Sequence, residues 1–122
     1  VYSEEMENYW SFQKKSMLAI NELAKKNKAK FIIVVLPDRR QIIDELWSQY
    51  AEILDDVQLN RTKPSDLVSD FGAGNSIQVI NLYSIFYERN KNSTIYLKYD
   101  GHLIPEGHGI VAEEIYRNFN KK

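Results

Sequence analysis

Cysteine is absent from this sequence of 122 residues. Without thiols the chain cannot form disulfide bonds, thiolate metal sites or a cysteine nucleophile. Histidine is scarce as well, because His102 and His108 are the only two. A zinc site built from these histidines and Asp100 would need a fourth ligand or a water, and the separation of the histidines matches no standard spacing. We therefore predict no metal site and no cofactor, and we interpret His108 as a structural residue.

The sequence also lacks an excess of charge of either sign and any long apolar run. Sixteen basic residues stand against seventeen acidic ones, and the formal net charge is -1. No overall field therefore favours nucleic acid or an anionic membrane. No apolar stretch is long enough to cross a bilayer, while a hydrophobic content of 43% predicts a folded globule. We expect a soluble domain without a nucleic-acid partner and without a membrane-spanning segment.

A start methionine and a secretion signal are missing too. The chain opens with Val1-Tyr2-Ser3 and shows no charged-then-apolar pattern. We interpret this start as a cut made for expression or by processing, and the compartment stays open. The length fits one domain, residues 1–122, and is small for a complete doubly wound hydrolase. We expect this domain to be the C-terminal part of a larger one.

Hydrophobic periodicity predicts a chain in which helices alternate with two buried strands. Residues 31–36 form an unbroken, mostly β-branched run, which is typical of a strand buried on both faces of a parallel sheet. Residues 77–82 give the second strand. Helices are predicted where apolar residues recur every three or four positions, over residues 3–27, 41–55, 63–71, 83–87 and 105–118. This order predicts an α/β fold with a short parallel sheet flanked by helices.

Two sets of side chains allow both a structural and a functional interpretation. An aromatic stripe at helical spacing could be a substrate platform, but it is more often core, and we favour core for Tyr9, Trp10 and Phe12. Arg39 and Arg40 follow the first strand at its carboxyl end, where open α/β sheets bind ligands. We favour the simpler interpretation of exposed arginines in the first turn of a helix.

The stretch of residues 99–108 carries the concentrated chemistry of the chain. Asp100 stands two residues before His102, and Gly101 lets the turn between them bend. A carboxylate in that place can accept a hydrogen bond from one imidazole nitrogen and leave the other facing outward as a base. This is the orienting acid and the base of a hydrolytic triad. The helix predicted from Pro105 would anchor the turn, and Asp100 and His102 are the candidate catalytic residues.

This stretch resembles the closing block of the SGNH, or GDSL-type, esterases and O-acetyltransferases. That block is a D-x-H turn that runs into a terminal helix, and here it reads Asp100-Gly101-His102, then Pro105-Glu106-Gly107-His108 and Val111-Ala112-Glu113. The resemblance implies a three-layer flavodoxin-like fold and acyl transfer on an ester, for example an acetylated carbohydrate. It also implies that Asp100 and His102 are two thirds of a triad whose serine lies in an N-terminal Gly-Asp-Ser block. The specific motif covers the last quarter of the chain.

The Gly-Asp-Ser block is absent from this sequence. None of the serines present lies in a predicted strand-to-helix elbow with a glycine-rich oxyanion turn. We therefore expect the C-terminal part of an SGNH-like esterase or O-acetyltransferase, which supplies Asp100 and His102 to a serine elsewhere. The alternative is a non-catalytic α/β module for binding or assembly, because fold alone does not determine function.

The outer edge of the predicted strand at residues 31–36 carries no internal charge or proline to protect it. In the fold that the resemblance implies, a strand N-terminal to this chain would pair there. We predict that the edge pairs with another copy of the chain or is covered by the helix of residues 3–27. Of these two outcomes we favour a homo-oligomer formed through the strand edge.

Overall fold

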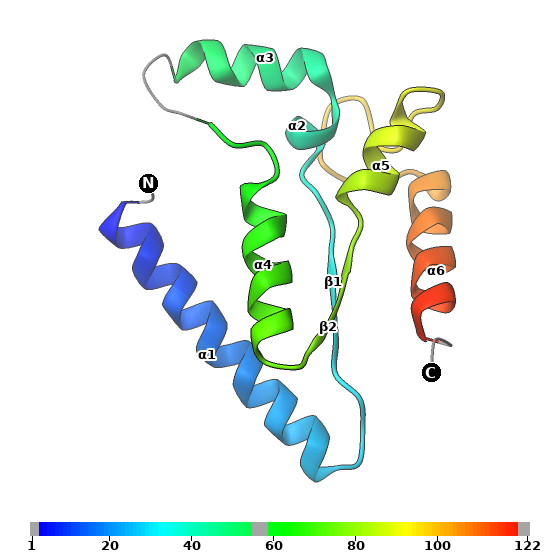
Figure 1. Cartoon of the computed structure of the whole chain (residues 1–122). Helices are drawn as coiled ribbons and strands as arrows, with labels where there is room; N and C mark the ends of the chain where they lie inside the picture. Colours follow the sequence, from blue (N-terminus) through cyan, green and yellow to red (C-terminus); the bar gives the residue numbers. More distant parts are fainter. Residues whose placement is uncertain (1–2, 55–58, 120–122) are drawn as a thin grey trace.

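The computed structural model describes residues 3–54 and 59–119. It is a mixed α/β structure made mostly of helices (Figure 1). None of the described helices is both long and apolar enough to cross a membrane. In chain order the elements are α1 (Glu4–Lys26), β1 (Ile32–Val35), α2 (Arg39–Ile42), α3 (Asp44–Ile53), α4 (Lys63–Gly74), β2 (Gln78–Asn81), α5 (Tyr83–Asn90) and α6 (Pro105–Phe119).

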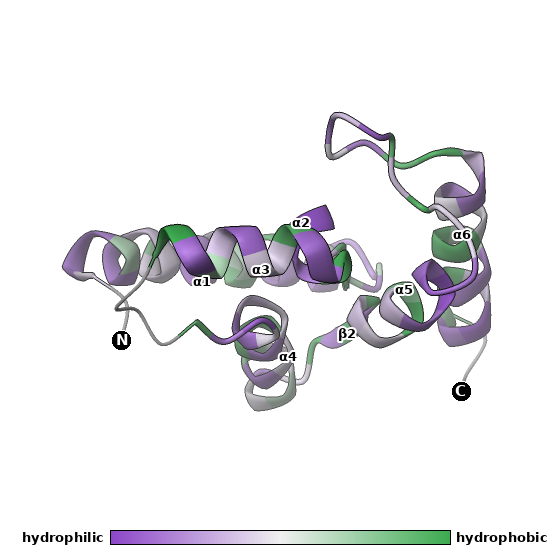
Figure 2. Ribbon diagram, turned by 90° about the horizontal axis from the view of Figure 1, so that it is seen from above, coloured by the Kyte–Doolittle hydropathy of each residue, from purple (hydrophilic) through white to green (hydrophobic). Residues whose placement is uncertain are grey.

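The two predicted strands form a parallel pair, with Ile32 opposite Gln78 and Val35 opposite Asn81. Helices α1 and α4 lie on one side of this pair and α6 lies on the other, in both the side view and the view from above (Figures 1 and 2). The predicted α/β class with a short parallel sheet flanked by helices is therefore confirmed.

The core lies where β2, α5 and the segment before α6 meet. Phe86 and Ile95 have no exposed surface, and Leu82 is only 1% exposed. The other members of this cluster are Ile42, Ile80, Tyr96 and Ile110. Burial of these apolar side chains is the main force that holds the last third of the chain onto β2.

Helix α4 continues past the predicted end at residue 71, through Gly72, and stops at Gly74. Gly72 is buried, and a Cβ there would lie 2.9 Å from the carbonyl oxygen of Ile77 and closer still to Val79. The glycine is needed because α4 packs directly on the backbone that leads into β2.

The helix predicted over residues 41–55 is divided into α2 and α3 at Ile43, whose backbone is extended. Asp38 caps α2 in a reciprocal capping box with Gln41. Arg61 fills the break, because its Nε donates to the carbonyl of Gln41 at 2.6 Å and its Nη1 donates to Asp44 at 2.6 Å. The predicted end of the helix, at Asp55, lies outside the described residues.

Helix α1 confirms the predicted helical span but only part of the predicted core. Trp10 packs edge-on against Phe71 of α4, with ring centroids 6.1 Å apart. Tyr9 and Phe12 are 62% and 67% exposed. Trp10 is half-buried against α4, whereas the core interpretation is wrong for Tyr9 and Phe12, whose side chains stay mostly exposed to solvent.

Strand β1 pairs with β2 alone among the described residues, so no third described strand covers its outer edge. All four of its side chains are half-buried, and the following Leu36 is 53% exposed. The proposed pairing of this edge with another copy stays a prediction.

Candidate active site

The Asp100-Gly101-His102 turn is the tip of a short hairpin-like loop between α5 and α6. Tyr96 and Leu103 form an antiparallel bridge at its base. The backbone N–H of Leu97 donates to the carbonyl of His102 at 2.8 Å. These bonds close the loop over residues 98–101 and hold Asp100 and His102 in place at its tip.

Two side-chain hydrogen bonds tie this loop to the segment that follows β1. The buried Tyr96 hydroxyl donates to the carbonyl of Pro37 at 2.6 Å. Arg39 donates from Nη2 to the carbonyl of Lys98 at 2.8 Å. The loop therefore lies at the carboxyl ends of both strands (Figure 1), which is the edge where open α/β sheets bind ligands.

The loop leads directly into α6, which begins at Pro105 as predicted. Glu106, in the first turn of α6, accepts a hydrogen bond from the hydroxyl of Ser93 at 2.9 Å. A carboxylate suits this end of a helix because the backbone N–H groups there carry partial positive charge. The turn therefore has a fixed helix on its C-terminal side.

Asp100 and His102 contact each other as predicted. Asp100 Oδ1 lies 3.1 Å from His102 Nδ1 and accepts the backbone N–H of His102 at 2.8 Å. The backbone hydrogen bond from His102 is the main reason that the pKa of Asp100 is lowered, and the His102 side chain and the charge of Arg39 lower it further. Asp100 is therefore an anion at neutral pH and can orient the imidazole.

The imidazole is open to solvent. The side chain of His102 is 84% exposed and that of Asp100 is 51% exposed. With a proton on Nδ1, His102 donates to Asp100 and keeps a lone pair on Nε2, the atom that a base uses. The pair can therefore accept a proton from a group that approaches from outside the loop.

A cavity of about 360 Å³ lies beside Asp100. It is lined by Asp38, Arg39, Arg40, Leu46, Tyr99, Asp100 and Gly101. None of these residues is a serine, threonine or cysteine. The cavity thus has room for part of a small ligand, but its own lining offers no hydroxyl or thiol nucleophile of the kind that acyl transfer uses.

The two arginines at this edge differ in their surroundings. Arg40 is exposed and pairs with Asp38 at 2.8 Å, as the simpler interpretation expects. Arg39 is half-buried, and its Nε is buried with no hydrogen-bond partner in the described structure. The prediction of an exposed arginine is therefore wrong for Arg39, which instead holds the loop that carries Asp100 and His102.

Sequence reasoning predicted the contact between Asp100 and His102 but missed both anchors of their loop. Tyr96 and Arg39 each reach a partner 59 positions away in the chain. The only local signals for these anchors were the aromatic residue in a short extended segment and the arginine after a strand.

His108 lies exposed on the first turn of α6. No group of three potential metal ligands occurs within residues 3–54 and 59–119.

Comparison with known proteins adds no relative: no protein-family model, curated protein or solved structure matches the chain.

Proposed function

We propose that this chain supplies the acid and base of an SGNH-like esterase or O-acetyltransferase, as the C-terminal part of that catalytic domain. The observation that carries the proposal is the contact of 3.1 Å between Asp100 Oδ1 and His102 Nδ1 in an exposed turn. The turn is followed by the helix that the D-x-H motif requires. Its position at the carboxyl ends of the strands supports the same interpretation.

In the proposed reaction a serine from outside this chain attacks the acyl carbon of an ester. His102 Nε2 takes the proton of the serine hydroxyl while Asp100 stabilises the resulting imidazolium. The tetrahedral intermediate then expels the alcohol, which takes that proton from His102, and leaves an acyl-serine. Water or a sugar hydroxyl next gives its proton to His102 and attacks the acyl-serine. Return of this proton to the serine oxygen releases the acid or the acylated sugar.

A non-catalytic binding or assembly module is the second candidate. It is favoured by the lining of the cavity beside Asp100, which contains no serine, threonine or cysteine. A chain that keeps the scaffold without a nucleophile would bind an ester or a carbohydrate without turning it over. The two candidates differ in whether His102 moves a proton.

The test uses the native gene product that contains these residues, with 4-nitrophenyl acetate as substrate and a fluorophosphonate probe for an activated serine. We expect hydrolysis and labelling, and we expect His102→Ala to lower kcat by at least about a thousandfold because it removes the general base. His108→Ala is the matched control and should keep wild-type rates. Hydrolysis that is unchanged in His102→Ala, or an absence of serine labelling in the wild type, would favour the binding module.

A further inference from the structure

Helix α1 presents an apolar stripe that no other described element covers. Met6 and Tyr9 are 48% and 62% exposed at its N-terminal half, and Ile20 and Leu23 are 50% and 62% exposed at its C-terminal half. Gln13 and Ser16 lie between them on the same face, since all six positions follow the alternating three- and four-residue spacing of a coiled-coil seam. We call the face formed by Met6, Tyr9, Gln13, Ser16, Ile20 and Leu23 the α1 stripe.

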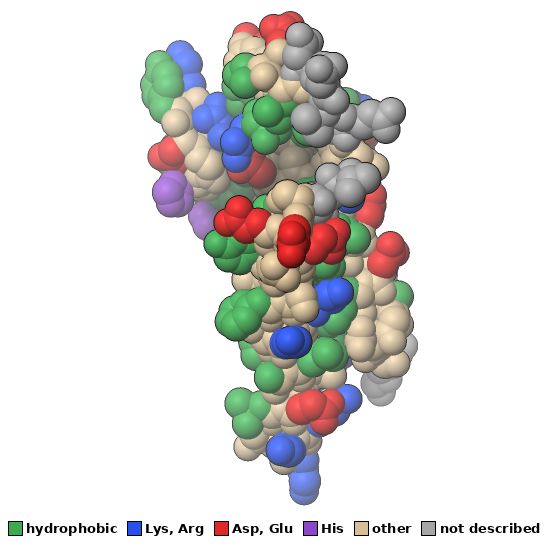
Figure 3. Space-filling model, turned by 90° about the vertical axis from the view of Figure 1, so that its left-hand side faces the viewer, with side chains coloured by type: hydrophobic (Ala, Val, Ile, Leu, Met, Phe, Trp, Pro, Cys, Tyr) green, Lys and Arg blue, Asp and Glu red, His purple; other side chains and the backbone are tan. Residues whose placement is uncertain are grey.

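The two ends of α1 carry opposite charge. Glu4, Glu5 and Glu7 stand in its first turn, and Lys25 and Lys26 stand in its last turn. Figure 3 shows acidic side chains grouped at one end of this helix and basic ones along its middle and at the other end, where an acidic side chain also lies. A second α1 that runs antiparallel would set each acidic end beside a basic end.

We propose that the α1 stripe binds the α1 stripe of a second copy of this chain in an antiparallel arrangement. Contact along the whole stripe selects one register, in which the numbers of facing stripe residues add up to 29. Met6 then faces Leu23 of the other copy and Tyr9 faces its Ile20. Gln13 faces Ser16, and this central pair can hydrogen-bond and resist a shift of register, as a polar residue does in a coiled-coil seam.

The residues that flank the stripe fit the same register. On the flank away from α4, Glu5 of one copy lies next to Lys26 of the other, and the two-fold axis repeats this pair. On the same flank the exposed ring of Phe12 lies next to Ala19, whose small side chain leaves room for it. Lys14 and Lys15, the residues nearest the two-fold axis, both fall outside the stripe, and Lys14 lies over the ring of Trp10. No like charges therefore meet in the seam.

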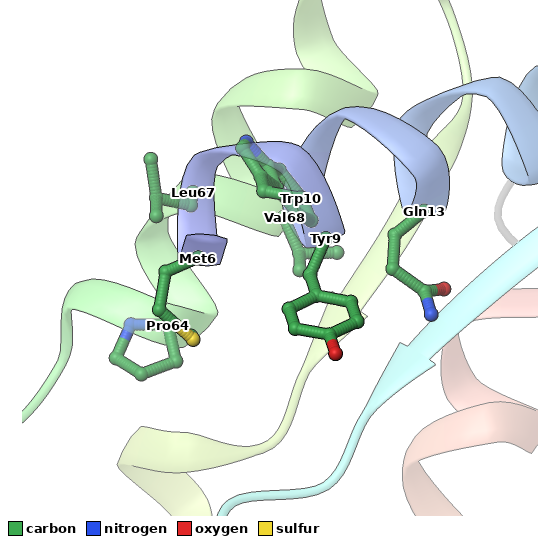
Figure 4. Close-up of a pocket in the computed structure, with 7 residues that line it drawn as sticks. All are labelled: Met6, Tyr9, Trp10, Gln13, Pro64, Leu67 and Val68. Atoms are coloured by element: carbon green, nitrogen blue, oxygen red, sulfur yellow. The ribbon is translucent and has the colours of Figure 1, made fainter. Parts of the chain in front are cut away.

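A preformed groove supports the same site. Its volume is about 270 Å³, and it lies between the start of α1 and the start of α4. The α1 residues Met6, Tyr9, Trp10 and Gln13 form one wall, and Pro64, Leu67 and Val68 form the other (Figure 4). In the proposed register the apolar side chains Ile20 and Leu23 of the second copy reach this groove. An apolar knob in an apolar hole is the contact that stabilises paired helices.

Charge reversal tests the arrangement. We expect wild type to show a concentration-dependent monomer–dimer equilibrium in sedimentation velocity. Glu5→Lys places two lysines together at each end, and Lys26→Glu places two acids together, so each variant alone should dimerise about tenfold more weakly at low salt. An equal mixture of the two variants, or the double variant in one chain, should regain wild-type affinity. Circular dichroism checks that all the variants remain folded.

Engineered cysteines test the register, since the chain has no natural ones. Positions 6 and 23 lie about 25 Å apart along one helix, too far for a disulfide within a chain. The double variant Met6→Cys/Leu23→Cys should therefore form disulfide-linked dimers under mild oxidation. The matched control Glu7→Cys/Glu22→Cys, on the opposite face of the helix, should not.

Three results would overturn the proposal. A strict monomer at all concentrations would show that another polypeptide or nothing covers the stripe. Ready crosslinking of Met6→Cys alone would show a parallel pair. Dimerisation unaffected by either charge reversal would move the contact to another surface, such as the outer edge of β1. None of these results bears on the acid and base at Asp100 and His102, so the proposed function is tested independently.

Discussion

Gly107 lies so close to Ile95 that a Cβ at the glycine would be 2.8 Å from the carbonyl oxygen of Ile95 and 3.1 Å from the Cβ of Leu103. Both partners belong to the base of the loop that carries Asp100 and His102. Helix α6 thus contacts this base through a glycine, backbone against backbone. The glycine of the Pro-Glu-Gly-His segment therefore sets how closely the terminal helix packs on the base of the turn that carries Asp100 and His102.

Gly107→Ala should destabilise the protein by about 1–3 kcal/mol, because the added methyl group overpacks rigid backbone. Gly109→Ala is the matched control in the same helix, since a Cβ at Gly109 would meet no atom within 4 Å. It should stabilise α6 by about 0.5–1 kcal/mol through helix propensity. Urea denaturation followed by circular dichroism measures both, and equal shifts in the same direction would contradict the close contact.

Tyr96→Phe should lower the free energy of unfolding by about 1–3 kcal/mol. The substitution removes the donor to the Pro37 carbonyl, a buried hydrogen bond of 2.6 Å, and leaves that oxygen unsatisfied. Burial also raises the pKa of the Tyr96 hydroxyl, so the donor keeps its proton over the whole physiological range. Tyr99→Phe, at a side chain that is 86% exposed, should change the stability little in the same urea titration.

The helices and strands followed from local patterns, and the main departures from the predictions come from distant residues. The break at Ile43 could not be predicted, because the group that donates a hydrogen bond to the backbone carbonyl of Gln41 is Arg61, which lies outside the window in which periodicity is read. The exposure of Tyr9 and Phe12 could not be predicted either. Periodicity shows that a helix has an apolar face, but only the tertiary arrangement shows which part of that face is covered.

The candidate site shows the same difference between local contacts, which could be predicted, and contacts between distant residues, which could not. The Asp-Gly-His spacing predicted the contact between Asp100 and His102 because both ends of that contact lie in one turn. The anchors of the turn, Tyr96 to Pro37 and Arg39 to Lys98, join segments that only the fold brings together. The contact within the turn could be predicted from the sequence, and the long-range hydrogen bonds that anchor the turn could not.

The stability of the protein should fall at low pH partly through Asp38. The hydrogen bond from Arg40 is the largest cause of its lowered pKa. A carboxyl group whose pKa is lower in the folded state stabilises the fold above its ordinary pKa, near 3.8. That contribution is lost as the pH falls through the lowered value. Asp38→Asn should therefore unfold with a weaker dependence on pH below about 5.

Arg40→Gln tests the same contribution from the other side of the pair. Removal of the guanidinium brings the pKa of Asp38 back towards its ordinary value, so the dependence of stability on pH should weaken as it does in Asp38→Asn. Midpoints of urea denaturation measured between pH 2 and pH 6 give this comparison. A pH dependence that stays at the wild-type level in both variants would show that the Asp38–Arg40 pair contributes nothing in solution.

The 122-residue chain by itself should hydrolyse 4-nitrophenyl acetate no faster than an equal concentration of free imidazole groups. His102 is exposed and can act as a simple base, but the cavity beside Asp100 has no serine, threonine or cysteine in its lining. Without an acyl-enzyme, the progress curve should show no burst and the rate should rise linearly with substrate concentration. His102→Ala and His108→Ala should each lower this slow rate by a similar small amount. A burst or saturation that disappears in His102→Ala alone would show that a serine of this chain completes the site.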